Sequence, residues 1–205
     1  MKLTIAVTGG VACGKSLVSS LFERAFPAGT MSSFNCDEAV ASLYQEREVQ
    51  ERIQRIGKKF GVELISENAI CRKTLRELLF ENSEFREKIE AVLHPLVLSR
   101  VDSYSQAITD AVRISLIEVP LLYEVDFPLV RDLDLVVAAS RAVQVERLCQ
   151  GRGLDAEVAE RIIDSQLRIE KKIEKGNIVI WNDGALEVLE LQIRHLASRC
   201  KNLLN

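Results

Sequence analysis

The chain has 205 residues, of which 47% are hydrophobic and 28% charged, and its formal net charge is -3. This length fits one or two domains with a sizeable core, and the slightly acidic balance argues against a general nucleic-acid coat, which needs clustered positive charge. We expect no membrane span and no signal peptide, because no apolar run has the required length. The five cysteines form no CxxC pair, so we expect reduced thiols and a cytoplasmic location.

Short apolar strands alternate with helical segments along the chain. We expect a strand over 3–7, a helix from Lys15 to about Phe26, and a strand in TMSSFNC that ends at Asp37 with a helix after it. Helices follow from about 45 to 112, and then two strands in RISLIEV and LDLVVAA. A helical stretch over about 141–172, a strand in NIVIW and a helix from about Ala185 complete the chain. This alternation predicts an α/β fold, a parallel sheet with helices on both faces.

The helical block between the second and third strands is too long for a simple crossover. We therefore expect three parts: a core formed by 1–44, 113–140 and 173–205, an inserted helical subdomain at 45–112, and a smaller helical part at 141–172 that is rich in charges of both signs.

A phosphate-binding loop follows the first strand. The pattern G-x-x-x-x-G-K-[ST] is met by Gly9, Gly14, Lys15 and Ser16. Glycine allows the loop to curl so that successive backbone N–H groups point at phosphate oxygens. Lys15 is expected to reach the β- and γ-phosphates and Ser16 to bind Mg²⁺, with the helix N-terminus adding partial positive charge. The residues expected to bind the nucleotide here are Gly9, Gly10, Val11, Ala12, Cys13, Gly14, Lys15, Ser16 and Leu17.

The loop alone does not separate kinases, GTPase switches and ATP-driven machines. The N-K-x-D element typical of guanine-specific switches is missing, and a motor or transporter ATPase would usually need a longer chain. A small sheet with an inserted helical block and a second charged helical segment favours a small-molecule kinase that closes over both substrates and excludes water.

The sequence resembles the dephospho-coenzyme A kinase family. The resemblance runs through almost the whole chain, in VTGGVACGKS, CDEAVA, ICRKTLRELLF, VLHPLV, EVPLLYE, QVERL and IVIWNDG. It implies a three-layer P-loop fold with an inserted acceptor-binding subdomain and a lid. It also implies that the protein uses ATP and Mg²⁺ to phosphorylate the ribose 3′-hydroxyl of dephospho-CoA, giving CoA and ADP. We expect this small substrate as the partner and expect no binding to nucleic acid or membrane. We expect the protein to be a monomer or a weak homo-oligomer.

The resemblance assigns catalytic roles to Asp37 and Arg147, in addition to Lys15. Asp37 matches the second Asp of the family's D-x-D element and would accept a proton from the 3′-hydroxyl or orient it. The alternative is that Asp37 only caps the following helix. Arg147 matches the arginine at the base of the lid and would neutralise the transferred phosphoryl group, unless it is a solvated arginine paired with Glu146 or Glu157.

Four further residues are expected to bind the acceptor. In the resemblance Arg72 and His94 line its pocket, with the arginine suited to the diphosphate. His94-Pro95 also has a structural interpretation, with Pro95 in the first turn of a helix. Glu124 would touch the acceptor or cap a turn, and Thr8 would face the acceptor.

Three residues complete the expected nucleotide and metal contacts. Glu118 ends its strand where P-loop proteins often keep a carboxylate for the magnesium shell. Asn182 matches a family position where adenine is held, although Asn-Asp-Gly is also turn sequence. Arg152 is expected to contact the nucleotide from the lid.

Several positions depart from the family pattern. Asn35 stands where the family has the first Asp of D-x-D, Ala41 where it has an arginine, and Gly151 where it has a second lid arginine, for which Arg152 could substitute. Gly176-Asn177 replaces the usual Ala-Asp. Two alternatives therefore stay open: a nucleoside or nucleotide kinase of the same fold, and a regulator that binds ATP without turnover.

Cys13 is unusual for the family position. A thiol beside Lys15 and a helix N-terminus predicts a depressed pKa and sensitivity to oxidants. A small residue that the loop merely tolerates is the alternative.

Overall fold

The computed structural model describes residues 2–66, 69–125 and 127–204. The chain divides into two compact units, one formed by Met1–Asn35 with Ile108–Asn205 and the other by Cys36–Ala107.

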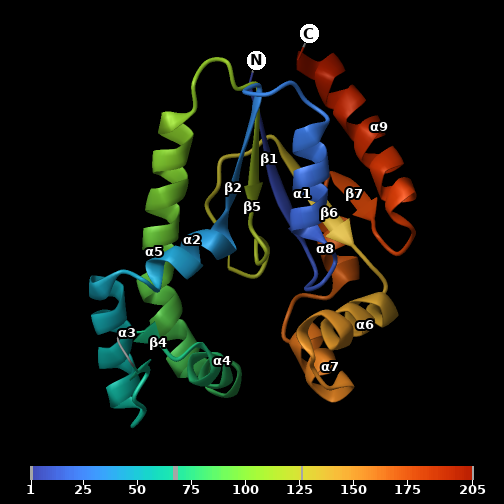
Figure 1. The fold of residues 1–205 in the computed structure, drawn as a ribbon. Coiled ribbons are helices and arrows are strands. Elements are labelled where there is room, and N and C mark those ends of the chain that lie inside the picture. The colour runs from blue at the N-terminus through green and yellow to red at the C-terminus, as the bar shows by residue number, and fades with distance from the viewer. Residues whose placement is uncertain (1, 67–68, 126, 205) are drawn as a thin grey trace. The chain divides into compact units, whose positions relative to one another are not determined.

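The first unit is built on a five-stranded sheet (Figure 1). All its strand pairs are parallel, in the order β2-β5-β1-β6-β7. The strands are β1 (Leu3–Gly9), β2 (Met31–Asn35), β5 (Ile114–Glu118), β6 (Leu133–Ala138) and β7 (Ile178–Trp181). Every residue of β5 is buried. Every residue of β1 is also buried except Thr4, which is half-buried. Burial on both faces explains why these strands are continuous apolar runs without alternation.

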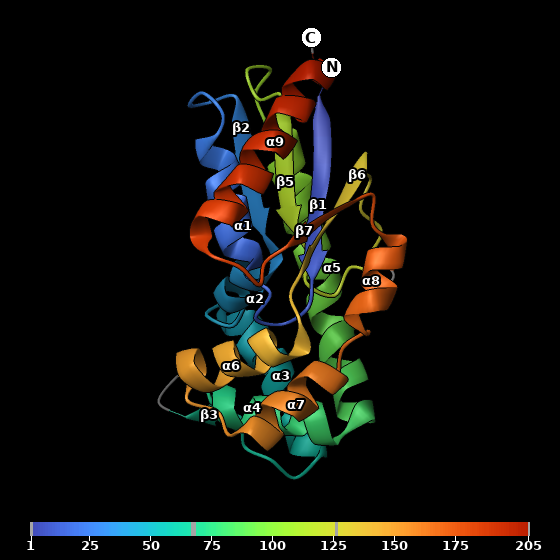
Figure 2. The same cartoon turned by 90° about the vertical axis from the view of Figure 1, so that its right-hand side faces the viewer.

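Helices cover this sheet as the alternation predicted. Those that pack against its strands are α1 (Lys15–Arg24), α8 (Ile169–Lys175) and α9 (Leu186–Leu204). Helices α6 (Arg141–Arg152) and α7 (Ala156–Asp164) of the same unit pack against each other. Helices α1 and α9 pack against each other, and Val18, Phe22 and Ile193 join the apolar core beside the strands. Helix α8 packs against β6 and lies on the other side of the sheet from α1 and α9 (Figure 2).

The register brings the expected site residues to one edge of the sheet. Glu118 at the end of β5 lies opposite Val7 of β1 and Asn35 of β2, and Gly9 lies opposite Val137 of β6. Open parallel sheets bind their ligands at this carboxyl edge.

The second unit is mainly helical, as expected. Its elements are α2 (Cys36–Leu43), α3 (Arg47–Lys59), β3 (Ile65–Ser66), β4 (Ala69–Ile70), α4 (Arg72–Glu81) and α5 (Ser83–Ala107). Helix α5 contacts α2, α3 and α4, and its Phe85 packs edge-on against Phe60 with 5.3 Å between ring centroids. The antiparallel pair β3–β4 was not predicted. It is too short to show a period, and the Gln54 side chain holds its start by accepting from the backbone N–H groups of Leu64 and Ile65.

The structural interpretation of Pro95 is wrong. This proline lies inside α5 and not in its first turn. The helix begins earlier because the Asn82 side chain accepts a hydrogen bond from the Phe85 N–H group, which satisfies an orphan donor of the first turn. Burial of Leu93 and Val97 on both sides of the proline offsets the lost backbone hydrogen bond.

The described helices include none that combines the length and the apolar character needed to cross a bilayer.

Candidate functional site

The loop between β1 and α1 has the backbone geometry of a phosphate cradle. Gly9, Ala12 and Gly14 have positive φ values of 145°, 57° and 91°. A Cβ atom at Gly9 would lie 2.0 Å from the Val137 carbonyl oxygen, and one at Gly14 would lie 2.4 Å from the Asn182 side-chain nitrogen. The two glycines of the motif are therefore required by both conformation and space.

The carbonyl groups of the loop are held by side chains. Arg147 Nη1 donates to the Ala12 carbonyl at 3.2 Å, Asn182 Nδ2 to that of Cys13 at 2.9 Å and Lys15 Nζ to that of Gly10 at 3.0 Å. A peptide group with its oxygen fixed in this way has its N–H group fixed in the opposite direction, which is what a nest of amides for an anion needs.

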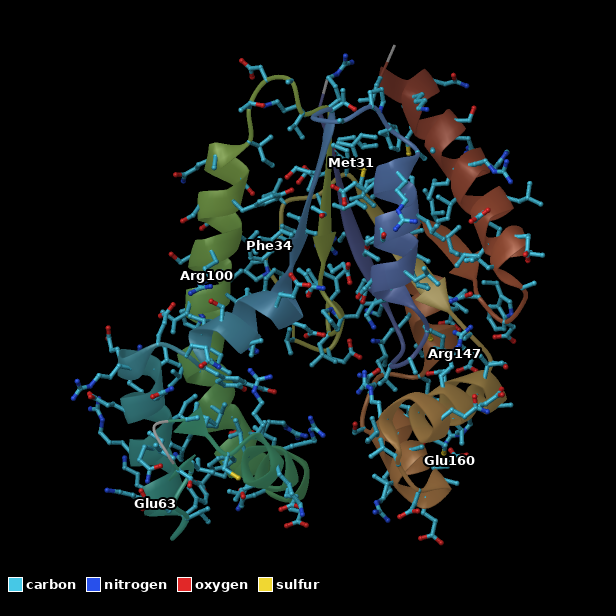
Figure 3. The ribbon with its side chains drawn as sticks, in the orientation of Figure 1. Met31, Phe34, Glu63, Arg100, Arg147 and Glu160 are labelled. Carbon is cyan, nitrogen blue, oxygen red and sulfur yellow. The ribbon has the colours of Figure 1, made fainter. Side chains whose placement is uncertain are left out.

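Arg147 lies on α6, beside the loop (Figure 3). Its Nη2 donates to the backbone carbonyl of Asn182 at 2.8 Å, so the guanidinium joins two segments. The hydrogen bonds of Arg147 go to these carbonyls, so the alternative of a solvated arginine paired with Glu146 or Glu157 does not describe the structure. The predicted contact with a transferred phosphoryl group stays a prediction.

Asn182 is 4% exposed and follows β7. Its side-chain amide donates to the Cys13 carbonyl, which commits one donor to the loop. The structure thus brings Asn182 to the nucleotide loop, and its expected contact with adenine is untested.

Ser16 and Glu118 meet at the edge of the sheet. The Ser16 hydroxyl donates to the Glu118 carboxylate at 3.2 Å, and Glu118 is buried. A hydroxyl and a carboxylate are oxygen donors of the kind that Mg²⁺ takes while it keeps several waters, so these two residues fit the ion. Among the described residues no cluster of three or more His, Cys, Asp or Glu side chains could hold a metal, and this pair therefore carries the magnesium prediction.

Thr8 contacts the segment that follows β5, and Glu124 belongs to that segment. Thr8 is fully buried and its hydroxyl donates to the Pro120 carbonyl at 3.2 Å. Glu124 Oε1 accepts from the Leu167 N–H group at 3.1 Å and from Lys172 Nζ at 2.7 Å. Its second oxygen, Oε2, is buried and has no hydrogen-bond partner within the described part of the chain.

The prediction of a depressed pKa for Cys13 is wrong. The side chain is fully buried, and burial raises the pKa of the Cys13 thiol by more than Lys15 and the backbone hydrogen bonds lower it. Burial opposes the charged thiolate, so the basis for oxidant sensitivity at this position is lost.

Arg152, the last residue of α6, is exposed, and Gly151 before it has open space around it.

A pocket of about 250 Å³ lies within the second unit. It brings together Asp37 and Arg72, two of the predicted residues, and it does not include His94, which is half-buried on α5. The lining residues are Asp37, Val40, Ala41, Tyr44, Arg72, Leu75, Arg76 and Leu79. Tyr44 and Arg76 were missed, because a sequence without spatial contacts does not show which faces of α2 and α4 meet.

The pocket combines positive charge with an aromatic wall. The Arg72 guanidinium lies 5.9 Å from the centre of the Tyr44 ring, a cation–π distance, and burial raises the pKa of Tyr44. Asp37 lies in the first turn of α2, which begins at Cys36, so it is inside the helix and not at the N-cap position. Arg72 and Arg76 in this pocket are suited to bind a diphosphate, and the Asp37 carboxylate is suited to accept a hydrogen bond from a hydroxyl.

The fold and the phosphate loop define a P-loop kinase. A model of the family "Dephospho-CoA kinase" matches residues 3–187. The chain therefore belongs to the dephospho-CoA kinase family.

Named relatives agree with this assignment. A dephospho-CoA kinase of Fusobacterium nucleatum is 35% identical over 189 residues, covering 91% of this chain and 93% of the relative. One of Bacillus licheniformis is 30% identical over 205 residues, covering 99% of each.

Solved structures share the fold. A crystal structure of a Thermus thermophilus protein superposes with a TM-score of 0.79 at 24% identity and 97% coverage of both chains. Dephospho-CoA kinase from Campylobacter jejuni gives 0.60 at 22% identity and 97% coverage of both. Shikimate kinase from Acinetobacter baumannii gives 0.53 at 15% identity, covering 100% of this chain and 93% of that one. These three show the fold alone.

Proposed function

We propose that the protein transfers the γ-phosphoryl group of ATP to the ribose 3′-hydroxyl of dephospho-CoA and releases CoA and ADP. The observation that carries the donor half of this proposal is the phosphate loop, with its positive φ values and its carbonyls held by Lys15, Arg147 and Asn182. The acceptor half is supported by family membership over residues 3–187.

The donor is bound by the loop and by Ser16 and Glu118. The loop amides and Lys15 hold the phosphates, and Ser16 and Glu118 would hold Mg²⁺. When bound, the ion neutralises charge on the phosphate oxygens.

The acceptor binds through the pocket of α2 and α4. Arg72 and Arg76 pair with its diphosphate, and Asp37 orients the 3′-hydroxyl and accepts its proton. The oxygen then bonds to the γ-phosphorus while the bond from that phosphorus to the β–γ bridging oxygen breaks, and ADP takes the released electron pair. The transition state is loose, so positioning contributes more than base strength. Thr8, His94 and Glu124 remain predicted acceptor contacts, and Arg152 a predicted nucleotide contact.

This proposal includes acceptor binding by residues 45–112, a lid formed by residues 141–172, and nucleotide binding by the core. It also includes the cytoplasmic location and the monomeric or weakly associated state predicted from the sequence.

The proposal is tested by ADP formation with ATP, Mg²⁺ and dephospho-CoA, with adenosine and AMP as parallel acceptors. We expect turnover on dephospho-CoA alone, lost in Asp37→Asn and retained in Glu38→Gln, a matched change at the next residue of the same exposed turn. Turnover on adenosine or AMP would favour a nucleoside or nucleotide kinase. ATP binding without turnover on any acceptor would favour the regulator suggested by Asn35, Ala41 and Gly151.

A further inference from the structure

Lys172 is a fully buried lysine on α8. Its ammonium group donates to Glu124 Oε1 at 2.7 Å, to the Pro120 carbonyl at 3.1 Å and to the Gly9 carbonyl at 3.2 Å. An ammonium group has three N–H donors, so the three acceptors use all of them. A buried charge is tolerated only when it is paired and hydrogen-bonded in this way.

The three acceptors belong to two segments of the chain, Gly9 at the start of the phosphate loop and Pro120 and Glu124 in the segment after β5. Gly9 ends β1 and opens the phosphate loop, and Lys15 also donates to its carbonyl, at 3.4 Å. Pro120 follows β5 and the carboxylate of Glu118, and its carbonyl also accepts from Thr8. Glu124 is a predicted acceptor contact. One ammonium group therefore fixes the spacing between the start of the phosphate loop and the segment after β5.

Residues just before Lys172 contact the same two segments. Gln166 Oε1 accepts from the Val11 N–H group at 2.9 Å, and the Leu167 N–H group donates to Glu124. The chain from 166 to 172, at the end of the predicted lid, thus holds the loop at both Gly9 and Val11.

We infer that Lys172 is a positioning residue for phosphoryl transfer, which acts through the Gly9 carbonyl and the Glu124 carboxylate without touching either substrate. This inference rests on the proposed function for its turnover readout. Without the ammonium group, the peptide that joins Gly9 to Gly10 loses one of its two charged donors and is freer to rotate. Small displacements of a phosphate cradle reduce transfer because the reacting atoms must be closely placed.

A merely structural role for Lys172 would consist of neutralising the buried Glu124. The two roles are separated by comparing Lys172→Met with the double variant Lys172→Met/Glu124→Gln. Removing one partner of a buried pair leaves an uncompensated charge, so Lys172→Met is expected to melt at a lower temperature and the double variant to recover much of that loss. Lys172→Arg keeps the charge and the donors. Lys171→Met is the matched control, because Lys171 is exposed on the same helix and pairs with Glu174.

The measurements are the melting temperature, the Kd for MgATP without acceptor, and kcat with dephospho-CoA for the single variants. We expect Lys172→Met and the double variant to bind MgATP about tenfold more weakly, the size of a lost charged hydrogen bond. In Lys172→Met, kcat should fall about 10- to 100-fold. Lys172→Arg should recover most of both quantities, and Lys171→Met should match the unmodified chain.

Unchanged MgATP affinity in the stable double variant would overturn the inference and leave Lys172 only its pairing with Glu124. That result would leave the proposed function intact. Absence of MgATP binding by the unmodified chain would overturn the proposed function and this inference together.

Discussion

The side-chain amide of Asn182 donates to the Cys13 carbonyl at 2.9 Å, so the segment after β7 fixes a peptide group of the phosphate loop. The same asparagine accepts from Arg147 through its backbone carbonyl. A residue far along the chain is therefore part of the support of the cradle.

Replacing Asn182 with alanine should weaken nucleotide binding. The Cys13 carbonyl would lose its donor in a buried place, at a cost of about 1–3 kcal/mol, and the loop would be less well held. We expect the KM for ATP to rise about tenfold or more, measured by steady-state kinetics at saturating acceptor. Gln192→Ala, which removes exposed hydrogen bonds to the Trp181 backbone, should leave this KM unchanged. An Asn182→Ala enzyme with normal KM would show that the contact does not shape the loop.

Replacing Arg147 with lysine should lower kcat strongly although the charge is kept. A lysine ammonium lacks the planar fork that reaches both Ala12 and Asn182. We expect a fall of about 100-fold in kcat, measured under saturation with both substrates. The control is Arg141→Lys on the same helix, where the arginine pairs with Glu160 and Asp164 at the surface. Equal effects of the two substitutions would argue that only the stability of α6 matters.

Replacing Glu118 with glutamine should change the magnesium dependence. The amide keeps an oxygen near Ser16 but removes the negative charge that favours a divalent cation. We expect the Mg²⁺ concentration for half-maximal activity to rise about tenfold, with activity approaching the unmodified level at high Mg²⁺. A Mg²⁺ titration that overlays that of the unmodified chain would remove Glu118 from the metal site.

The cysteines should differ in the pH at which they react. Burial raises the pKa of Cys13, whereas a hydrogen bond with Thr74 lowers the pKa of Cys71. A lowered pKa means more thiolate at a given pH, so Cys71 should be alkylated at lower pH than Cys13 in the folded protein.

Iodoacetamide labelling followed by mass spectrometry between about pH 7 and 9, the range around a normal thiol pKa, measures this order. Thr74→Val should move the labelling of Cys71 to higher pH and leave Cys13 unchanged. Faster labelling of Cys13 would restore the idea of a reactive thiol in the loop.

Much of the fold could be predicted because its signals are local. The strand predicted over 3–7, the glycines of the loop and the helix from Lys15 each have a short-range physical cause. The structure contains all three, with the strand extended to Gly9. The sheet edge followed from the rule for parallel strands, and Ser16 and Glu118 do meet there.

The remaining features depend on burial, which the sequence does not show directly. Cys13 lies beside a lysine and a helix N-terminus, and only the packed loop reveals that burial outweighs both. Lys172 lies in EKKIEK, whose lysines cannot be told apart by sequence. Only the fold shows that Lys172 is the buried one. Pro95 continues α5 because apolar residues on both sides are packed, an effect that outweighs its local tendency to end a helix.

The most direct test of the account is to follow the γ-phosphoryl group of labelled ATP onto dephospho-CoA and onto its 3′-deoxy analogue. The account predicts a labelled product identical to CoA from the first and no labelled product from the second, because the transferred group is received by the 3′-oxygen. Labelling of the analogue, or a product of dephospho-CoA with the phosphate at another position, would contradict it.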